Sequence, residues 1–177
     1  TVDPITYKIY TFLGGYYGEI LSNLIDQQKI SCSTIPINES TRVCNMIYES
    51  SNGQVHSVNE PGPVIQKDDI KSFLKKVNNS INEKDFVLIS GSLPIISNDF
   101  YQQIIKLVEK KKGKVILDTS GDPLKMAMKS NPWFLKINQH AFSEMYNLKS
   151  FHDENEIISV LEEFDQNTIV TLGAGGS

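Results

Sequence analysis

An α/β fold, with a doubly wound and mostly parallel sheet flanked by helices, is predicted by three features of the sequence. Short segments rich in Val, Ile and Leu recur from residue 86 onward without polar alternation, which is typical of strands buried on both faces of a parallel sheet. Helix-like segments separate them, as expected for right-handed βαβ units. Several of these strands end in Gly, Ser or Thr, and ligands of such sheets bind beyond the carboxyl ends of the strands.

The first part of the chain predicts two helices and a β-hairpin. The expected elements are a helix over residues 18–27, strands over 41–48 and 54–59, and a helix over 68–77. Asn52-Gly53 lies between the two strands, and Asn-Gly is the strongest short signal for a tight hairpin. We expect residues 36–62 to form a small β lid or a dimer contact within the α/β domain.

The second part of the chain predicts alternating strands and helices. The expected elements are strands at residues 86–89, 114–117, 133–135 and 168–172, and helices at 100–108, 124–129, 140–148 and 153–164. Ser97 or Asn98 is the expected N-cap of the helix that begins near residue 100, and Gly113 is its expected stop. The third strand ends at Lys136-Ile137-Asn138.

Composition limits the classes of function. With 177 residues, 40% of them hydrophobic, the chain is long enough for one α/β domain spanning residues 1–177. A net charge of −4 argues against a nucleic-acid partner, which would favour a basic excess. No apolar run approaches the roughly 18 residues of a membrane span. The two cysteines, Cys32 and Cys44, lack CxxC spacing, so we expect neither a disulfide scaffold nor a zinc site, and a cytoplasmic location.

Polar residues follow each predicted strand of the second part. They are Ser90-Gly91-Ser92, Thr119-Ser120-Gly121, Lys136 with Asn138, and Gly173 to Ser177. Because the carboxyl ends of parallel strands meet at one edge of the sheet, these groups predict a site for a polyanion there. The alternative is that the Gly and Ser residues only mark turns.

Seven short segments, in this order, resemble the ribokinase-like (phosphofructokinase-B type) carbohydrate kinases. They are Phe12-Leu13-Gly14-Gly15, Glu39-Ser40-Thr41-Arg42, Asn59-Glu60-Pro61-Gly62-Pro63, Ile89-Ser90-Gly91-Ser92-Leu93-Pro94, Leu117-Asp118-Thr119-Ser120-Gly121, Lys136-Ile137-Asn138 and Thr171-Leu172-Gly173-Ala174-Gly175-Gly176. Each is weak alone, and the fourth is the most specific. The resemblance is to the hexose-phosphate branch, which includes tagatose-6-phosphate kinases and 1-phosphofructokinases.

The resemblance implies ATP-dependent phosphorylation of a hexose phosphate, with ATP and Mg²⁺ as cofactors. Arg42 and Ser92 are the implied substrate-binding residues, and the Arg42 guanidinium can hold two phosphate oxygens at once. The implied nucleotide-binding residues are Lys136, Asn138, Thr171, Gly173 and Gly176. A homodimer formed through the hairpin is also implied.

The chain departs from the family pattern at several places. We find no Gly-Ala-Gly-Asp segment, which carries the family's catalytic base, and no Gly-Gly-Lys-Gly sugar loop, so no catalytic residue is assigned. Ile137 replaces the Pro of the Lys-Pro-Asn motif, and Ala141 replaces an acidic residue linked to magnesium, with Glu144 one helical turn beyond. The metal ligands therefore remain unassigned.

Two explanations of these departures stay open. The chain is either an incomplete copy of a kinase or a decayed family member that binds nucleotide or sugar phosphate, and in both cases we expect these residues alone not to turn over substrate. A third hypothesis is a nicotinamide-dependent oxidoreductase that uses the turn from Gly173 to Gly176. Three substrates also stay open, namely tagatose 6-phosphate, fructose 1-phosphate and fructose 6-phosphate.

Overall fold

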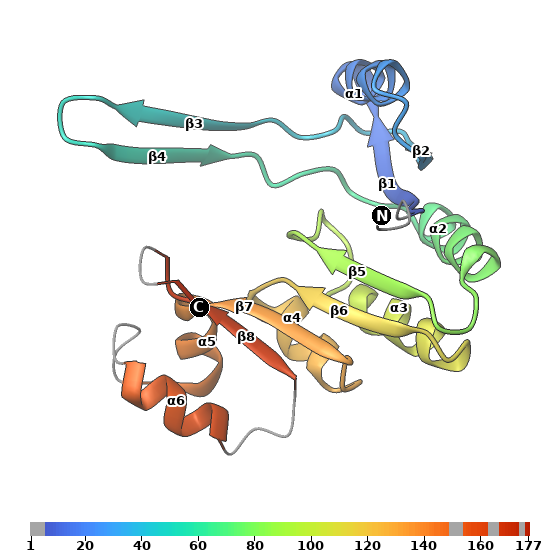
Figure 1. Cartoon of the computed structure of the whole chain (residues 1–177). Helices are drawn as coiled ribbons and strands as arrows, with labels where there is room; N and C mark the ends of the chain where they lie inside the picture. Colours follow the sequence, from blue (N-terminus) through green and yellow to red (C-terminus); the bar gives the residue numbers. More distant parts are fainter. Residues whose placement is uncertain (1–5, 149–153, 163–166, 174–175) are drawn as a thin grey trace, which may run out of the picture. The chain divides into compact units, whose positions relative to one another are not determined.

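The computed structural model describes residues 6–148, 154–162, 167–173 and 176–177 (Figure 1). The chain divides into two compact units, the first made of residues 1–77 and 94–96 and the second of residues 78–93 and 97–177. The expectation of one domain over residues 1–177 stays a prediction.

The first unit contains a parallel pair of strands joined by a helix. Strand β1 (Ile9–Gly14) pairs with β2 (Cys32–Ile37), and α1 (Gly15–Gln27) connects them. Helix α2 (Lys67–Ser80) packs on β1 through Phe73, whose ring lies 4.8 Å from that of Phe12 between centroids. The two helices were predicted, whereas β1 and β2 were not.

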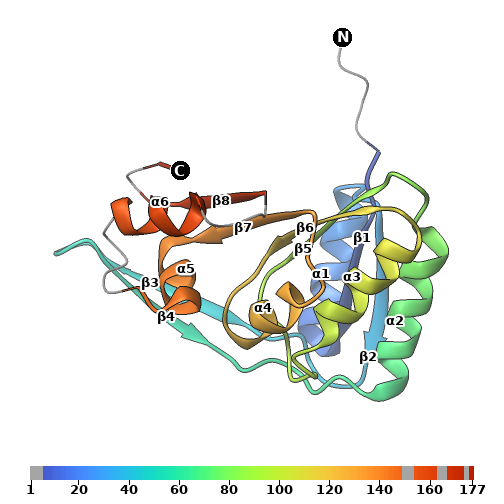
Figure 2. The ribbon, with the colours of Figure 1, turned by 90° about the horizontal axis from the view of Figure 1, so that it is seen from below.

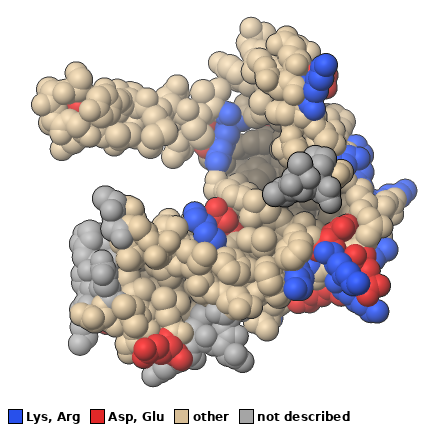
Figure 3. Space-filling view, in the orientation of Figure 1, with Lys and Arg blue, Asp and Glu red and all other residues tan. Residues whose placement is uncertain are grey.

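The predicted hairpin is confirmed as an antiparallel pair. Strand β3 (Cys44–Glu49) pairs with β4 (Gln54–Asn59), with Cys44 opposite Asn59 and Glu49 opposite Gln54. Every residue of both strands is exposed, and Glu49 is the one acidic or basic residue (Asp, Glu, Lys or Arg) among them, so Figure 3 shows the pair as almost uncharged. Its predicted roles as lid and dimer contact are not tested by its geometry.

The second unit confirms the predicted α/β fold class. Its four strands form one parallel sheet in chain order: β5 (Phe86–Ser90), β6 (Lys114–Asp118), β7 (Phe134–Asn138) and β8 (Thr168–Thr171). The helices between them are α3 (Phe100–Lys110), α4 (Gly121–Met128), α5 (Gln139–Tyr146) and α6 (Glu154–Glu162). Figures 1 and 2 show this alternation of strand and helix.

The two faces of this sheet differ in burial. One face carries the buried side chains Ile89, Val115, Leu117, Leu135, Ile137 and Val170. On the other face Phe86, Leu88 and Ile169 are 60%, 64% and 44% exposed. The expectation that these strands are buried on both faces is therefore wrong. The reason lies in the strand order, because successive crossovers of one hand all pass over the same face of a sheet.

Smaller differences concern the ends of elements. The N-cap of α3 is Asp99 and neither Ser97 nor Asn98, and the Asp99 carboxylate accepts a hydrogen bond from Gln103 Nε2 at 3.1 Å. Parts of the predicted helix over residues 153–164 lie outside the described residues. The same holds for Ala174 and Gly175, in the turn predicted after the last strand. In the portion of the chain that the structure describes, no helix combines the length and the apolarity needed to cross a membrane.

Candidate functional site

The carboxyl ends of β5, β6, β7 and β8 meet at one edge of the sheet in the second unit. The strand register places Ser90 of β5 beside Asp118 of β6, and Asn138 of β7 beside Thr171 of β8. These residues end their strands, and parallel pairing alone brings them to the same edge. Three of the residues expected to bind nucleotide, Lys136, Asn138 and Thr171, therefore lie on neighbouring strands.

Lys136 forms an ion pair with Asp118 at this edge. Its Nζ donates to both carboxylate oxygens, at 3.2 Å to Oδ1 and 3.3 Å to Oδ2. The Ser90 hydroxyl donates to Oδ2 of the same carboxylate at 3.5 Å. The Asp118 carboxylate thus accepts hydrogen bonds from a hydroxyl on one neighbouring strand and from an ammonium group on the other.

The loop after β5 is fixed at Gly91. Gly91 has φ +92°, a conformation that L side chains rarely adopt, and its N–H donates to the Asp118 carbonyl at 3.1 Å. The Gly91 carbonyl accepts two hydroxyl hydrogen bonds, from Thr119 at 2.8 Å and Tyr101 at 3.1 Å. These contacts hold the backbone that leads into Ser92, which is exposed.

Asn138 caps the helix that follows β7. Its side-chain oxygen accepts a hydrogen bond from Ala141 N at 2.8 Å, as expected for an N-cap residue. The amides of the first turn of α5 therefore lie directly beyond Lys136 and Asn138. Ala141 itself is buried, and Glu144 on the same helix is exposed.

A tight turn follows β8 at the same edge. Gly176 N donates to the Gly173 carbonyl at 3.2 Å, and Leu172 N donates to the Gly176 carbonyl at 2.6 Å. Both glycines have positive φ, +64° at Gly173 and +95° at Gly176. Glycines in this conformation let the backbone come close to a ligand.

The sugar-phosphate residue expected from the sequence, Arg42, lies in the first unit. Next to it, Thr41 exchanges two hydrogen bonds with Gly14: Thr41 N donates to Gly14 O at 2.8 Å, and Gly14 N donates to Thr41 Oγ1 at 3.1 Å. Val43 N donates to Glu60 Oε2 at 2.9 Å. A methyl group placed on Gly62 would lie 3.4 Å from Arg42 Cδ, so the arginine stem passes directly beside this glycine.

The structure thus gathers three of the seven matching segments around Arg42, and four at the edge of the second unit. Lys136, Asn138, Thr171, Gly173, Gly176 and Ser92 belong to strand ends or to the loops after them in the second unit. Arg42 belongs to the first unit and is half-buried. The roles assigned to these residues stay predictions, because a placement does not identify a ligand.

The hydrogen bonds made by Asp118, Thr119 and Tyr101 were not predicted, although Asp118 and Thr119 belong to a matching segment. Asp118 and Thr119 directly follow an apolar strand, so their place in the sequence was a usable signal. Tyr101 gave no such signal, because its hydroxyl reaches Gly91 from the first turn of α3.

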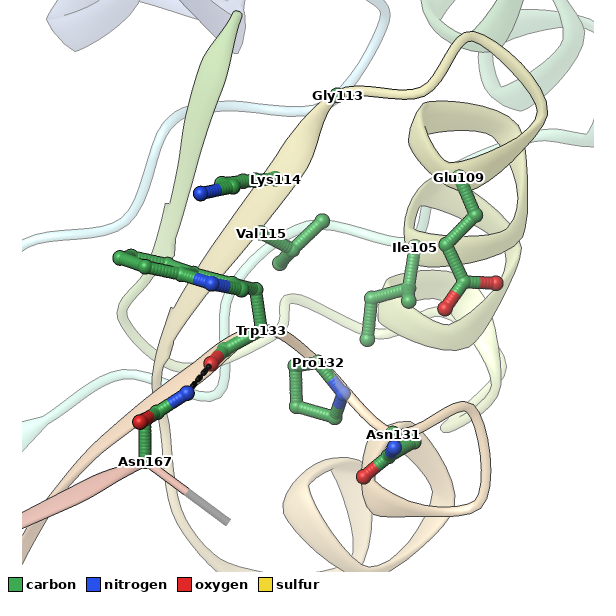
Figure 4. A pocket seen from close by; sticks show the side chains of 9 residues that line it. All are labelled: Ile105, Glu109, Gly113, Lys114, Val115, Asn131, Pro132, Trp133 and Asn167. Carbon is green, nitrogen blue, oxygen red and sulfur yellow. Dashed lines mark hydrogen bonds between the residues drawn. The ribbon is translucent and has the colours of Figure 1, made fainter. Parts of the chain in front are cut away.

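A cavity of about 300 Å³ opens at the opposite edge of the sheet, near the amino ends of β6 and β7 (Figure 4). The residues that line it are Ile105, Glu109, Gly113, Lys114, Val115, Asn131, Pro132, Trp133 and Asn167. Asn167 Nδ2 donates to the Trp133 carbonyl at 3.1 Å across its rim. Burial raises the pKa of the Glu109 carboxyl, against a weaker opposing effect of Lys106. None of the residues expected to bind nucleotide or substrate lines this cavity.

Chemically, the carboxyl edge of the second unit suits a polyphosphate. It offers an ammonium group, a glycine turn, the start of a helix, and hydroxyls. Asp118 at the end of β6 and Asp122 in the first turn of α4 carry carboxylates near this edge, and Mg²⁺ takes one or two carboxylates together with phosphate oxygens. In the described ranges no three His, Cys, Asp or Glu side chains form a metal cluster by themselves.

Comparison with known proteins agrees with this arrangement. The family model described as "pfkB family carbohydrate kinase" matches residues 8–177. A 1-phosphofructokinase from Borreliella burgdorferi is 30% identical over 171 residues, 94% of this chain and 54% of that relative. A tagatose-6-phosphate kinase from Staphylococcus epidermidis is 30% identical over 173 residues, 94% of this chain and 55% of that relative.

A solved structure shows the same fold. Escherichia coli phosphofructokinase-2 in complex with fructose-6-phosphate superposes with a TM-score of 0.83 at 23% identity, over 94% of this chain and 56% of that one. The chain therefore spans about half the length of the relatives that it matches.

Proposed function

The chain belongs to the pfkB family of carbohydrate kinases, and from this premise we propose that the protein transfers a phosphoryl group from ATP to a hydroxyl of a hexose phosphate. The observation that carries the proposal is the meeting of Lys136, Asn138, Thr171 and the Gly173 turn at one edge of a parallel sheet. Relatives named 1-phosphofructokinase and tagatose-6-phosphate kinase support a hexose phosphate as the acceptor. Tagatose 6-phosphate, fructose 1-phosphate and fructose 6-phosphate are the candidates.

On the nucleotide side, we assign the phosphate chain of ATP to the carboxyl edge of the second unit. Lys136 would neutralise phosphate charge, and the glycine turn after β8 would let the backbone come close to the phosphate oxygens. Asn138 would order the first turn of α5, because its side chain already caps that helix. Phosphoryl transfer depends mainly on such positioning and charge neutralisation.

The residues at the carboxyl edge of the second unit provide only some of the ligands that magnesium prefers. Bound with ATP, it would offset the negative charge of the phosphate chain. Ala141 offers no carboxylate at the position where the family carries an acidic residue, so Asp118 at the end of β6 is the residue that would hold the ion with the phosphates.

On the sugar side, we assign the phosphate of the acceptor to Arg42, with Ser92 as a hydroxyl donor. Arg42 is half-buried, and its loop is held by hydrogen bonds from Gly14 N to the Thr41 hydroxyl and from Val43 N to the Glu60 carboxylate. A fixed arginine can bind two oxygens of one phosphate. The hairpin β3–β4 is proposed as the lid and the contact of a homodimer, because both of its faces are exposed and nearly uncharged. A cytoplasmic location is part of the same proposal.

The test is titration calorimetry of the full chain with a non-hydrolysable ATP analogue, followed by a coupled assay for ADP release with each hexose phosphate. We expect Lys136→Met to weaken binding of the analogue at least tenfold, and Lys129→Met, at the end of α4, to leave it unchanged. A wild-type chain that binds no nucleotide would overturn the proposal. Binding without any ADP release by a chain known to be full length would favour the second candidate, a nucleotide-binding member that has lost catalysis, whose supporting observation is Ala141.

A further inference from the structure

The cavity near the amino ends of β6 and β7 has the size and the lining of a small-molecule site (Figure 4). Its volume of about 300 Å³ lies at the lower end of the usual range for ligand pockets. Three buried side chains, Ile105, Val115 and Pro132, provide an apolar wall, while Glu109 and Asn131 are exposed polar residues beside it. A ligand that fits this lining has a compact apolar body and a polar group.

The charges around the cavity indicate the sign of that polar group. Glu109 is the acidic residue that lines it, and no described side chain forms an ion pair with the Glu109 carboxylate. Lys114 is the basic residue that lines it, but its ammonium group lies 4.4 Å from the centroid of the Trp133 ring. In Figure 4 this ammonium group points away from Glu109. The charge that a ligand would meet in the cavity is therefore negative.

The Glu109 carboxylate is also incompletely solvated. Burial raises the pKa of this carboxyl, against a weaker opposing effect of Lys106, so the charged form lacks part of the solvation that it has in water. A positively charged group inside the cavity would replace that missing solvation.

The end of α3 adds a separate reason to expect a positively charged ligand. The helix ends at residue 110, so Glu109 lies in its last turn and Gly113 shortly after it. The last carbonyl groups of a helix carry partial negative charge, which favours a cation nearby. Residues 110–112 are all lysines, and none of them lines the cavity. Because their charges disfavour a polycation, a ligand with a single positive charge fits best.

We propose that this cavity binds a small organic cation, a primary amine with one positive charge and a compact aliphatic body. Glu109 pairs with the ammonium group of the ligand, and the wall of Ile105, Val115 and Pro132 holds the aliphatic body. The site goes beyond the proposed function, since none of the residues assigned to ATP or to the hexose phosphate lines the cavity.

The experiment compares three probes that share one aliphatic ring and differ in charge: cyclohexylamine, cyclohexanol and cyclohexanecarboxylate. Each is titrated into the full chain at neutral pH while the emission of Trp133 is followed, because this single tryptophan lines the cavity. Saturation-transfer NMR of the same probes measures the dissociation constants independently of the emission. We expect the amine to bind roughly threefold more tightly than the alcohol, as for one partly exposed ion pair, and the carboxylate to bind most weakly.

Two variants test the role of Glu109. Glu109→Gln removes the charge and keeps the shape, so the amine should bind no more tightly than the alcohol, whose own affinity should not change. The matched control is Glu83→Gln, which removes the same charge from the surface of the second unit. Glu83 pairs with Lys112 at 3.7 Å and does not line the cavity, so this variant should keep the wild-type preference for the amine.

Three results would overturn the inference. They are a wild type that binds none of the probes, a wild type that binds all three equally, and an equal loss of the preference in Glu109→Gln and Glu83→Gln. Each of them would leave the proposed kinase function standing, because the cavity and the candidate nucleotide site share no residue.

Discussion

The ammonium group of Lys114 lies 4.4 Å from the centroid of the Trp133 ring, at the amino edge of the sheet in the second unit. The same group lies 5.6 Å from the ring of Phe86, and the two rings meet edge to face at 5.4 Å between centroids. Figure 4 shows the lysine above the indole. Three side chains from β5, β6 and the loop before β7 thus form one cluster, and Trp133 is the single tryptophan of the chain.

We predict that Lys114→Gln lowers the free energy of unfolding by about 0.5–1 kcal/mol, the usual value of a cation–π contact at an exposed site. The emission of Trp133 should shift at the same time, because the charge nearest to its ring is removed. Denaturant unfolding followed by tryptophan fluorescence measures both. Lys75→Gln on α2 is the control and should change neither quantity.

A second prediction compares two leucines of the same sheet. Leu117 has no exposed surface, and Leu88 is 64% exposed on the opposite face. Leu117→Ala should destabilise the second unit by about 2–5 kcal/mol, the cost of a cavity in a packed core. Leu88→Ala should cost well under about 1 kcal/mol, because little buried surface is lost. Equal losses in urea melts of the two variants would contradict the one-sided burial of this sheet.

The sequence predicted the second unit better than the first for a physical reason. The strands β5 to β8 are apolar segments bounded by Gly, Ser or Asn, so each can be recognised alone. Strand β2 contains Pro36, which lacks a backbone N–H, and has no run of apolar residues, so its local pattern does not indicate a strand. Pairing with β1 decides its conformation, and pairing is not visible in a local window.

The candidate site was also predicted in part. The residues at the strand ends could be named, because parallel strands must share an edge. The contact of Lys136 with Asp118 could not, since it depends on the register between β6 and β7. The exposed face of the sheet was missed because an uninterrupted apolar segment looks the same whether one or both of its faces are covered.

A third prediction concerns Gly14 at the end of β1. A Cβ atom at this position would collide with the backbone carbonyl oxygens of Ile37 and Glu39, which cannot move aside as a flexible side chain can. Gly14→Ala should therefore lower the free energy of unfolding of the first unit by about 2–4 kcal/mol, as expected for overpacking against backbone.

The control for this variant is Gly53→Ala in the turn of the hairpin. Nothing lies within 4 Å of a Cβ there, and only the φ of +73° opposes the substitution. Gly53→Ala should lower the free energy of unfolding by about 1 kcal/mol, and the effect should stay within the hairpin. Thermal melts compare the melting temperatures of the two variants. A Gly14→Ala chain with the melting temperature of the wild type would show that β1 and β2 do not pair as described.

A fourth prediction uses the raised pKa of Glu109. Burial disfavours the charged carboxylate in the folded chain, so this group lowers stability as pH rises through its pKa, and has no such effect below its unfolded pKa. Glu109→Gln should therefore raise the melting temperature slightly at neutral pH. The gain in the free energy of unfolding should stay below about 1 kcal/mol, because the desolvation of this surface residue is only partial. The gain should vanish in acid. A gain of equal size at both pH values would point to packing instead of charge.

For Asp99 we expect the opposite effect of pH on stability. Its pKa is lowered, first by a hydrogen bond from Ser97 and further by one from Gln103, so the folded chain favours the carboxylate. Such a group stabilises the fold above its unfolded pKa, and the contribution is lost as pH falls through the lower, folded value. Asp99→Asn should therefore reduce stability at neutral pH and approach the wild type in acid, since Asn cannot carry the charge that these hydrogen bonds favour. Melting curves of the Asp99 and Glu109 variants over the same acid range should diverge as pH rises, one below the wild type and one above it. Parallel curves would mean that neither carboxyl lies in the environment described for the two ends of α3.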